Sequence, residues 1–271
     1  MVNGETAVLG LIGSPVSHSL SPYIHNMLAK EMGQNVVYAA FDVAEDDLET
    51  AIRGAFALGI RGLNVTYPHK VGAAKLAAFL EHRAAQVEAV NTLKYTQNGY
   101  IGYNTDVFGV KRAFEHHGVD IAGKTAVIAG AGAAARSAAF ALAQMGCQKV
   151  TVVNRTKKNA EMLAFSLEKY YNINVESCAI SELPSLSGFA YVHAAARDAV
   201  FPHPNFDSYD VFFDMNYANS SSLLQDAESL GILTVSSTLM LVYQAIAAFE
   251  IFCDVKIPQI TIDKVMEDMG G

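Results

Sequence analysis

The chain has 271 residues, of which 51% are hydrophobic and 17% are charged, and its net charge is -8. This is enough for one large or two medium globular domains. The acidic balance gives no general electrostatic footprint for nucleic acid, and no apolar run approaches the roughly 20 residues of a membrane span. The three cysteines show neither metal-ligand spacing nor a disulfide framework, and no signal peptide is visible. We therefore expect a cytoplasmic protein without a bound metal.

The first third alternates predicted strands, at 7–12, 36–41 and 62–66, with predicted helices, at about 21–32 and 45–58. The stretch between the first strand and the first helix is rich in hydroxyls. Ser21 followed by Pro22 predicts an N-cap and a first helical turn. With Ser19 beside it, this helix start is also a candidate site for a small carboxylate. Ordinary capping would explain Ser21 alone.

Polar residues gather where the strand at 62–66 ends. Asn64, Thr66 and Lys70 all lie at or just after its carboxyl end, and ligands of open α/β sheets bind at such ends. Further along, Asn91 precedes a predicted strand at 92–95, and Asp106 precedes a predicted helix at 107–117. Taken singly, Asn91 is equally well explained as a turn residue and Asp106 as a helix cap.

The sequence KTAVIAGAGAAAR, at 124–136, predicts a strand, a glycine turn and a helix. Gly130, Gly132 and Ala135 form a Gly-x-Gly-x-x-Ala pattern. The first glycine permits a tight turn, the second lets the backbone approach a pyrophosphate, and the small third residue lets helix and strand pack closely. A strand at 149–153 completes a βαβ unit. Packing alone would also account for the glycines. A dinucleotide would be bound by the residues of the turn and the helix start: Gly130, Ala131, Gly132, Ala133 and Ala134.

The residues after the strand at 149–153 indicate which dinucleotide the chain binds. An NAD site usually places Asp or Glu there to bind the ribose 2′-hydroxyl, whereas this chain has Asn154-Arg155-Thr156-Lys157. Arg can bind a 2′-phosphate with its planar fork. Cations at a helix N-terminus also oppose the helix dipole, so a bound phosphate explains them better than a solvated surface does. The sequence therefore predicts NADP as the cofactor.

The rhythm of strands continues at about 175–180, 189–193, 211–215 and 233–235. An apolar helix is predicted at 240–252, with Gln244 as a polar residue within it. A solvent-facing position would explain Gln244 without a function. Thr261 is a candidate cap for a last short helix.

Several of these stretches together resemble the shikimate dehydrogenase family. They are SHSLSPYIHN (17–26), LNVTYPHK (63–70), EAVNT (88–92), GYNTD (102–106), GAGAAAR (130–136), NRT (154–156) and MLVYQA (240–245). They occur in the family's order and cover nearly the whole chain. The resemblance implies an α/β fold with an N-terminal α/β substrate domain, residues 1–106 and 238–271, to which the C-terminal helices return. Residues 107–237 would form a Rossmann-type NADP-binding domain.

The resemblance also implies an oxidoreductase acting on a CH–OH group. It would reversibly reduce 3-dehydroshikimate to shikimate with NADPH, a step of aromatic amino acid biosynthesis. Lys70 and Asp106 match the catalytic pair, and Ser19 and Ser21 match the site of the substrate carboxylate. The other substrate-binding positions of the family match Asn64, Thr66, Asn91 and Gln244, near the ring hydroxyls, and Tyr217, at the junction of substrate and nicotinamide.

Three stretches depart from the family's pattern, at 193–198, 214–222 and 236–239, and all belong to the nicotinamide side. The alternatives are therefore a quinate or aminoshikimate dehydrogenase, or a shikimate-binding protein with weakened dehydrogenase activity. A relative that acts on folate-type substrates is disfavoured by the serine-rich carboxylate site. The expected partner is a small molecule, not nucleic acid or a membrane, and a homodimer stays open.

Overall fold

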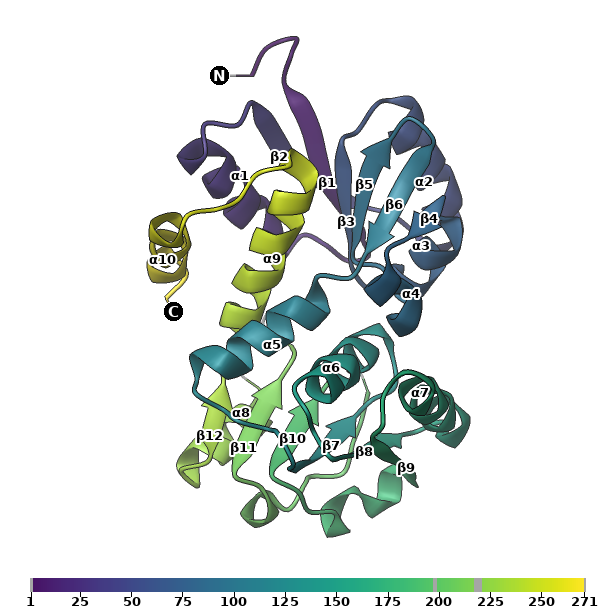
Figure 1. Cartoon of the computed structure of the whole chain (residues 1–271), viewed down its shortest axis with the longest axis vertical. Helices are drawn as coiled ribbons and strands as arrows, with labels where there is room; N and C mark the ends of the chain where they lie inside the picture. The colour runs from purple at the N-terminus through teal and green to yellow at the C-terminus, as the bar shows by residue number, and fades with distance from the viewer. Residues whose placement is uncertain (1, 197–198, 217–220, 271) are drawn as a thin grey trace. The chain divides into compact units, whose positions relative to one another are not determined.

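The structure is a computed structural model, and it describes residues 2–196, 199–216 and 221–270 (Figure 1). The chain divides into two compact units, Met1–Gly109 with Val242–Gly271, and Val110–Leu241. The chain passes from one unit to the other inside two helices, α5 (Asp106–His116) and α9 (Ser237–Cys253). No helix among the described residues is both long and apolar enough to cross a membrane.

The first unit is built on a mixed sheet. Its strands, in spatial order, are β2 (Val36–Asp42), β1 (Ala7–Gly13), β3 (Gly62–Val65), β5 (Thr92–Thr96), β6 (Gly99–Tyr103) and β4 (Phe79–Leu80). β1 runs parallel to β2 and β3, β5 is antiparallel to β3 and β6, and β4 is parallel to β6. The helices of this unit, besides the ends of α5 and α9, are α1 (Ser21–Glu31), α2 (Leu48–Ala57), α3 (Lys70–Leu76), α4 (His82–Val87) and α10 (Gln259–Asp268), and a 3₁₀ turn, η1 (Glu45–Asp47), precedes α2.

The side chains of β3 alternate between the two faces of this sheet. Leu63 and Val65 pack into the core that α2 covers. Gly62 lies on the other face, where an added Cβ would meet the ring of Phe252, on α9, at 2.2 Å. Figure 1 shows α2 and α3 on one side of the sheet and α1 and α9 on the other. Asn64, two residues after Gly62, therefore belongs to the face covered by α9.

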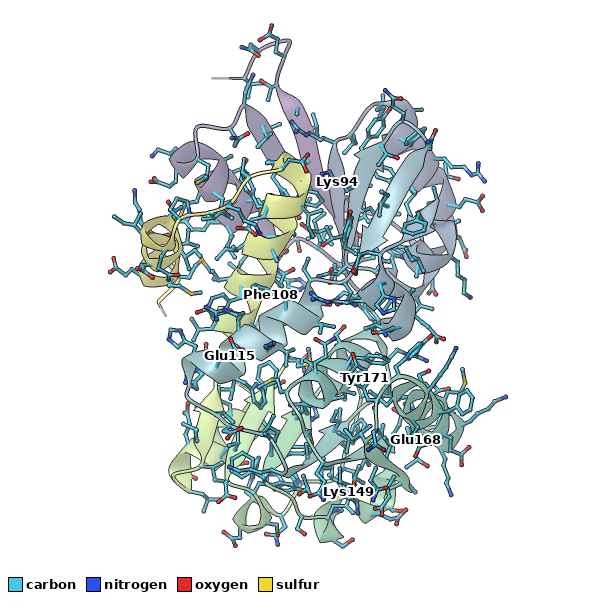
Figure 2. All side chains as sticks on the ribbon, viewed as in Figure 1. Lys94, Phe108, Glu115, Lys149, Glu168 and Tyr171 are labelled. Atoms are coloured by element: carbon cyan, nitrogen blue, oxygen red, sulfur yellow. The ribbon has the colours of Figure 1, made fainter. Side chains whose placement is uncertain are left out.

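An aromatic cluster joins α1, β2 and α9. The ring of His25 stacks on Tyr38 with centroids 4.2 Å apart, and it also contacts Phe249 and Phe252. Neither ring nitrogen of His25 has a partner among the described residues, and burial lowers its pKa to about 3, so the ring is neutral. At the far end of α9, Lys94 of β5, labelled in Figure 2, forms an ion pair with Asp254.

The second unit is built on an entirely parallel sheet. Its strands, in spatial order, are β12 (Leu233–Val235), β11 (Val211–Asp214), β10 (Ala190–His193), β7 (Thr125–Ala129), β8 (Lys149–Asn154) and β9 (Asn174–Ala179). Counted along the chain this is the strand order 3-2-1-4-5-6 of Rossmann folds, so the predicted fold class is confirmed. The helices are α6 (Ala133–Gln144), α7 (Lys157–Tyr170) and α8 (Ser222–Ser229), with 3₁₀ turns η2 (Ile180–Ser185) and η3 (Phe206–Ser208). Lys149, labelled in Figure 2, links β8 to β9 through an ion pair with Glu176.

Two predicted helix caps are wrong. Leu20, not Ser21, is the N-cap of α1, and Ser21 is the first helical residue. The Oγ of Ser19 accepts the N–H of Ser21, the first helical residue, at 3.2 Å. Pro258, not Thr261, is the N-cap of α10, and its backbone oxygen accepts the Thr261 N–H at 3.0 Å.

Thr96 pairs with Gly99, so the hairpin between β5 and β6 closes through residues 97 and 98. One further boundary differs from the prediction. Helix α9 starts at Ser237, three residues before the predicted apolar run, because Ser236 Oγ accepts the Leu239 N–H at 3.3 Å and caps it.

Candidate functional site

The centre of the candidate site is an ion pair between the first residues of two helices. Lys70 opens α3, just after β3, and Asp106 opens α5, just after β6. Lys70 Nζ lies 2.7 Å from Asp106 Oδ2, and the two side chains are 17% and 5% exposed. The carboxylate is thus almost fully enclosed, while the ammonium keeps some access. Two hydrogens of that ammonium point elsewhere than to Asp106, so it can donate to a further group.

Asn91 attaches a second polar element to this pair. Its Nδ2 lies 2.8 Å from Asp106 Oδ1, 2.9 Å from Thr105 Oγ1 and 3.3 Å from Gln244 Oε1. Its Oδ1 accepts the Thr105 backbone N–H at 2.7 Å. Asn91 is therefore more than a turn residue, because it fixes the second oxygen of the carboxylate that pairs with Lys70.

Asn64 extends the cluster across the sheet. Its Nδ2 donates to the Asn91 backbone oxygen and to Thr92 Oγ1, both at 3.0 Å, and its Oδ1 accepts the Tyr38 hydroxyl at 2.9 Å. The sequence alone gave no indication that Tyr38 and Thr92 belong to this cluster. Both lie in predicted strands, and only the pairing of β2, β1, β3 and β5 places them next to Asn64.

Gln244 joins the same cluster from α9. Its side chain is within hydrogen-bonding distance of Asn91 and the residue is only 8% exposed, so the solvent-facing explanation is excluded. The side chain of Thr66, by contrast, takes no part in the side-chain hydrogen-bond network of the described residues. A Cβ added at Gly13 would stand 2.2 Å from the methyl group of Thr66. Glycine is therefore required at position 13 for β1 to pass this close to Thr66.

Ser19 and Ser21 lie at the same edge of the sheet. They follow the carboxyl end of β1, whereas Thr66 and Lys70 follow the carboxyl end of β3, and these two strands are parallel neighbours. The Ser14 N–H donates to the Tyr67 oxygen at 3.0 Å, which ties the two following loops together. Ser21 is buried and Ser19 half-buried, and the Ser21 hydroxyl has no hydrogen-bond partner among the described residues.

A second group of predicted residues lies in the unit of residues 110–241, at the carboxyl end of β7. Gly130 has φ +115°, and a Cβ there would stand 2.7 Å from the Ala194 oxygen after β10. Gly132 is exposed and is the N-cap of α6, and a Cβ there would meet nothing within 4 Å. The fully buried Ala135 lets α6 pack on the sheet. Between them Ala131, Ala133 and Ala134 are half-buried. β7 and β10 are neighbours at the point where strand order reverses, where such folds bind ligands.

The residues after β8 present uncompensated positive charge. Arg155, Thr156 and Lys157 are exposed, Thr156 is the N-cap of α7, and the first turn of that helix holds no acidic residue. Asn154 Nδ2 donates to the Thr156 oxygen at 3.0 Å and holds this turn. Neither Arg155 nor Lys157 has an ion-pair partner among the described residues. The arrangement suits an anion with several oxygens.

Some of the predicted residues fall elsewhere. Tyr217 and residues 197–198 lie outside the described residues. Ser237, in the departing stretch at 236–239, is the first residue of α9, and its φ is not in the left-handed region. No group of His, Cys, Asp and Glu able to hold a metal ion occurs in the ranges that the structure describes.

Known proteins are similar to this chain over nearly its whole length. A family model described as the shikimate dehydrogenase substrate binding domain matches residues 11–93, and one described as shikimate / quinate 5-dehydrogenase matches residues 111–190. Shikimate dehydrogenase (NADP(+)) of Halobacterium salinarum is 42% identical over 252 residues, which cover 90% of this chain and 92% of that protein.

Solved structures of shikimate dehydrogenases are also similar to this chain over nearly its whole length. A shikimate dehydrogenase crystallised in complex with NADP+ is 35% identical to this chain with a TM-score of 0.86, and the match covers 99% of this chain and 97% of that one. A shikimate 5-dehydrogenase from Listeria monocytogenes, in complex with shikimate and NAD, is 29% identical with a TM-score of 0.87, over 99% and 98% of the two chains.

Proposed function

The chain belongs to the shikimate dehydrogenase family, and we propose that it catalyses the reversible, NADP-dependent reduction of 3-dehydroshikimate to shikimate. It is then an oxidoreductase acting on a CH–OH group of a small molecule, in aromatic amino acid biosynthesis. The observation that carries the proposal is the enclosed Lys70–Asp106 pair, at 2.7 Å, within a cluster of side-chain amides.

Lys70 is proposed to stabilise and protonate the oxygen of the ketone that is reduced. Bound NADPH supplies the hydride that reduces the ketone. As the carbonyl carbon is reduced, negative charge develops on its oxygen, and the ammonium of Lys70 can stabilise that charge and give a proton to it. Asp106 holds Lys70 in place through one hydrogen bond and leaves its other hydrogens for the substrate. In the direction of shikimate oxidation, the same lysine takes the proton of the hydroxyl.

The remaining residues of this unit are proposed to orient the substrate. Ser19 and Ser21, at the start of α1, would donate to the carboxylate, which the N-terminus of the helix also favours. Asn64, Thr66, Asn91 and Gln244 would face the ring hydroxyls. A substrate-binding role of Tyr217 stays a prediction. Hydroxyl and amide groups suit this task because a carboxylate and several hydroxyls need both donors and acceptors.

The residues at 130–134 and 154–157 fit NADP. The open space beside Gly132 leaves room for a pyrophosphate where a Cβ would otherwise project, and the N-terminus of α6 offers backbone N–H groups to it. Arg155, with Thr156 and Lys157, would bind the 2′-phosphate, while Asn154 shapes the turn that presents them.

The two glycines of this turn should respond differently to the same substitution. Gly130→Ala should lower the melting temperature, because it combines a positive φ with a Cβ 2.7 Å from a backbone oxygen. Gly132→Ala, where φ is ordinary and nothing stands within 4 Å, should leave the melting temperature nearly unchanged but raise the Kd of NADP at least about tenfold, because its methyl group takes the space of the pyrophosphate. Thermal melts and titration calorimetry measure both. A Gly132→Ala protein that binds NADP as tightly as the wild type would place the pyrophosphate elsewhere.

Arg155 should determine the choice between the two nicotinamide cofactors. Arg155→Ala should reduce kcat/KM with NADP by about ten- to 100-fold, the range of a charge-assisted hydrogen bond of about 1.5–3 kcal/mol, and should leave kcat/KM with NAD nearly unchanged. Lys169→Ala is a matched control, because Lys169 is an exposed cation at the other end of α7. A wild type equally active with NAD and NADP would contradict the proposed role of Arg155.

A direct assay tests the function as a whole. Purified protein is incubated with shikimate or quinate and with NADP or NAD, and formation of the reduced cofactor is followed by absorbance. We expect shikimate with NADP to give the highest kcat/KM. The second candidate is quinate oxidation, which the description of the family model matched at 111–190 also names. A higher kcat/KM for quinate would replace the proposed substrate, and binding of shikimate without turnover would favour the binding-protein alternative. A cytoplasmic location and a homodimer stay predictions.

A further inference from the structure

A continuous run of hydrogen bonds leads away from the Lys70–Asp106 pair into the sheet. Every step lies within the unit of residues 1–109 and 242–271, and every distance is 3.0 Å or less. The run passes through six side chains, in this order: Lys70, Asp106, Asn91, Thr92, Asn64 and Tyr38. The proposed function gives no role to Thr92 or Tyr38.

The direction of every bond in this run is fixed by groups that cannot reverse. The Lys70 ammonium can only donate, so Asp106 accepts. The Thr105 backbone N–H can only donate, and it points at Asn91 Oδ1, so Asn91 turns its Nδ2 to the carboxylate and its Oδ1 to Thr92. At the other end the Asn91 backbone oxygen can only accept. Asn64 therefore turns its Nδ2 to that oxygen and to Thr92.

Thr92 stands where the two amides meet. Its hydroxyl donates to Asn91 Oδ1 and accepts from Asn64 Nδ2, each at 3.0 Å, while a third partner, Thr105 Oγ1, lies farther away at 3.4 Å. A hydroxyl can do both, whereas a methyl group can do neither. Thr92 is 0% exposed, so water does not replace these bonds when the hydroxyl is lost.

This arrangement determines what Asn64 can offer to a ligand. Both hydrogens of its Nδ2 are engaged, and its Oδ1 accepts the Tyr38 hydroxyl at 2.9 Å with one of two lone pairs. What remains is the second lone pair of Oδ1. Tyr38 in turn is held by its stack on the buried ring of His25.

We propose that Thr92 and Tyr38 are positioning residues, which hold Asn64 so that it meets the substrate only as a hydrogen-bond acceptor. The site then selects a substrate hydroxyl that donates at this place, and it disfavours a substituent that can only accept. This inference rests on the proposed function, since it concerns how the same site recognises a ring hydroxyl of shikimate.

The experiment compares four variants with the wild type in the shikimate assay. Thr92→Val keeps the shape of the side chain, and Tyr38→Phe keeps the ring that stacks on His25. Thr92→Ser restores the hydroxyl. Tyr100→Phe is the control, because it removes a buried hydroxyl that donates to the Ile60 oxygen, away from this network, in the core that α2 covers. Each protein is assayed with shikimate and with analogues in which one ring hydroxyl at a time is replaced by fluorine.

We expect Thr92→Val to lower kcat/KM about ten- to 100-fold and Tyr38→Phe about three- to tenfold, following the cost of unsatisfied buried groups and of single neutral hydrogen bonds. Thr92→Ser should stay within about threefold of the wild type, and Tyr100→Phe should change the melting temperature but not kcat/KM. For one fluorinated analogue, the preference of the wild type for shikimate should shrink in Thr92→Val and Tyr38→Phe, because a released amide can turn its N–H toward fluorine. A merely structural role would not move this preference.

The outcomes separate this inference from the proposed function. If the wild type oxidises shikimate and both variants keep its kcat/KM and its preference against every analogue, the inference is overturned and the function stands. If the wild type oxidises neither shikimate nor quinate, the function fails, and a high-resolution structure of Tyr38→Phe and of Thr92→Val decides the inference. Rotation of the Asn64 or Asn91 amide then supports it, and unchanged amides overturn it.

Discussion

Replacing Lys70 by alanine is expected to lower kcat for shikimate oxidation by about 10²-fold or more, with a much smaller change in KM. The reason is that the proposed work of the ammonium, stabilising charge on the reacting oxygen and exchanging its proton, is done in the transition state. Steady-state kinetics with shikimate and NADP measure both constants. Asp106→Asn should behave in the same way, because the two groups form one ion pair with 2.7 Å between Nζ and Oδ2.

The control for Lys70→Ala is Lys75→Ala, on the same helix α3, where the side chain is exposed. That variant should keep both kcat and KM. Melting temperatures are needed beside the kinetics, because removing Lys70 leaves the enclosed carboxylate of Asp106 without its partner. Retained kcat with a large rise of KM would show that Lys70 only binds the substrate.

The double variant Ser19→Ala with Ser21→Ala is expected to weaken shikimate binding by about 10²- to 10⁴-fold. Each hydrogen bond to a charged group is worth about 1.5–3 kcal/mol, and about 1.4 kcal/mol corresponds to a factor of ten. Titration calorimetry with shikimate measures the loss. An analogue without the carboxylate should bind equally poorly to the wild type and to the double variant, because it has nothing to offer these hydroxyls.

The single variants separate binding from folding at this helix start. Ser19 Oγ accepts the Ser21 N–H, so Ser19→Ala removes this bond at the start of α1 as well as a donor, whereas Ser21→Ala leaves the bond intact. Ser17→Ala, in the same loop and exposed, is the matched control. If the double variant still prefers shikimate strongly over the analogue, a different group binds the carboxylate.

The elements that could be predicted best from the sequence are those that neighbouring residues in the chain determine. The glycine turn at 130–132 and the helix after it follow from positive φ at Gly130 and from small residues at the contact of α6 with the sheet, and the structure has them where they were predicted. The parallel pair of β7 and β8 was predicted from the βαβ unit, since strand, helix and strand follow one another within about 30 residues. The caps at Ser21 and Thr261 were wrong because the N-caps are the earlier residues Leu20 and Pro258.

The site could be predicted from the sequence only in part, because its contacts join residues that are far apart in the chain. Lys70 and Asp106 are separated by 36 positions, and Asn91 and Gln244 by 153. Spacing alone left Asp106, Asn91 and Gln244 with simpler explanations, and the resemblance to a family is what joined them to Lys70. Tyr38 and Thr92 belong to no matched role, and their place in the network depends on the register of β2 and β5 in the sheet.

The division of the chain has a consequence for the order in which the protein can fold during its synthesis. The unit of residues 110–241 is continuous, so it is complete once its last strand has left the ribosome. The other unit combines residues 1–109 with residues 242–271, so it lacks most of α9 until the continuous unit has been made. Until then Gly62 and the His25 ring have no Phe252 to pack against, and Asn91 has no Gln244. Domains fold as units during synthesis, so the segment made first, residues 1–109, is the one that must wait with an uncovered apolar face.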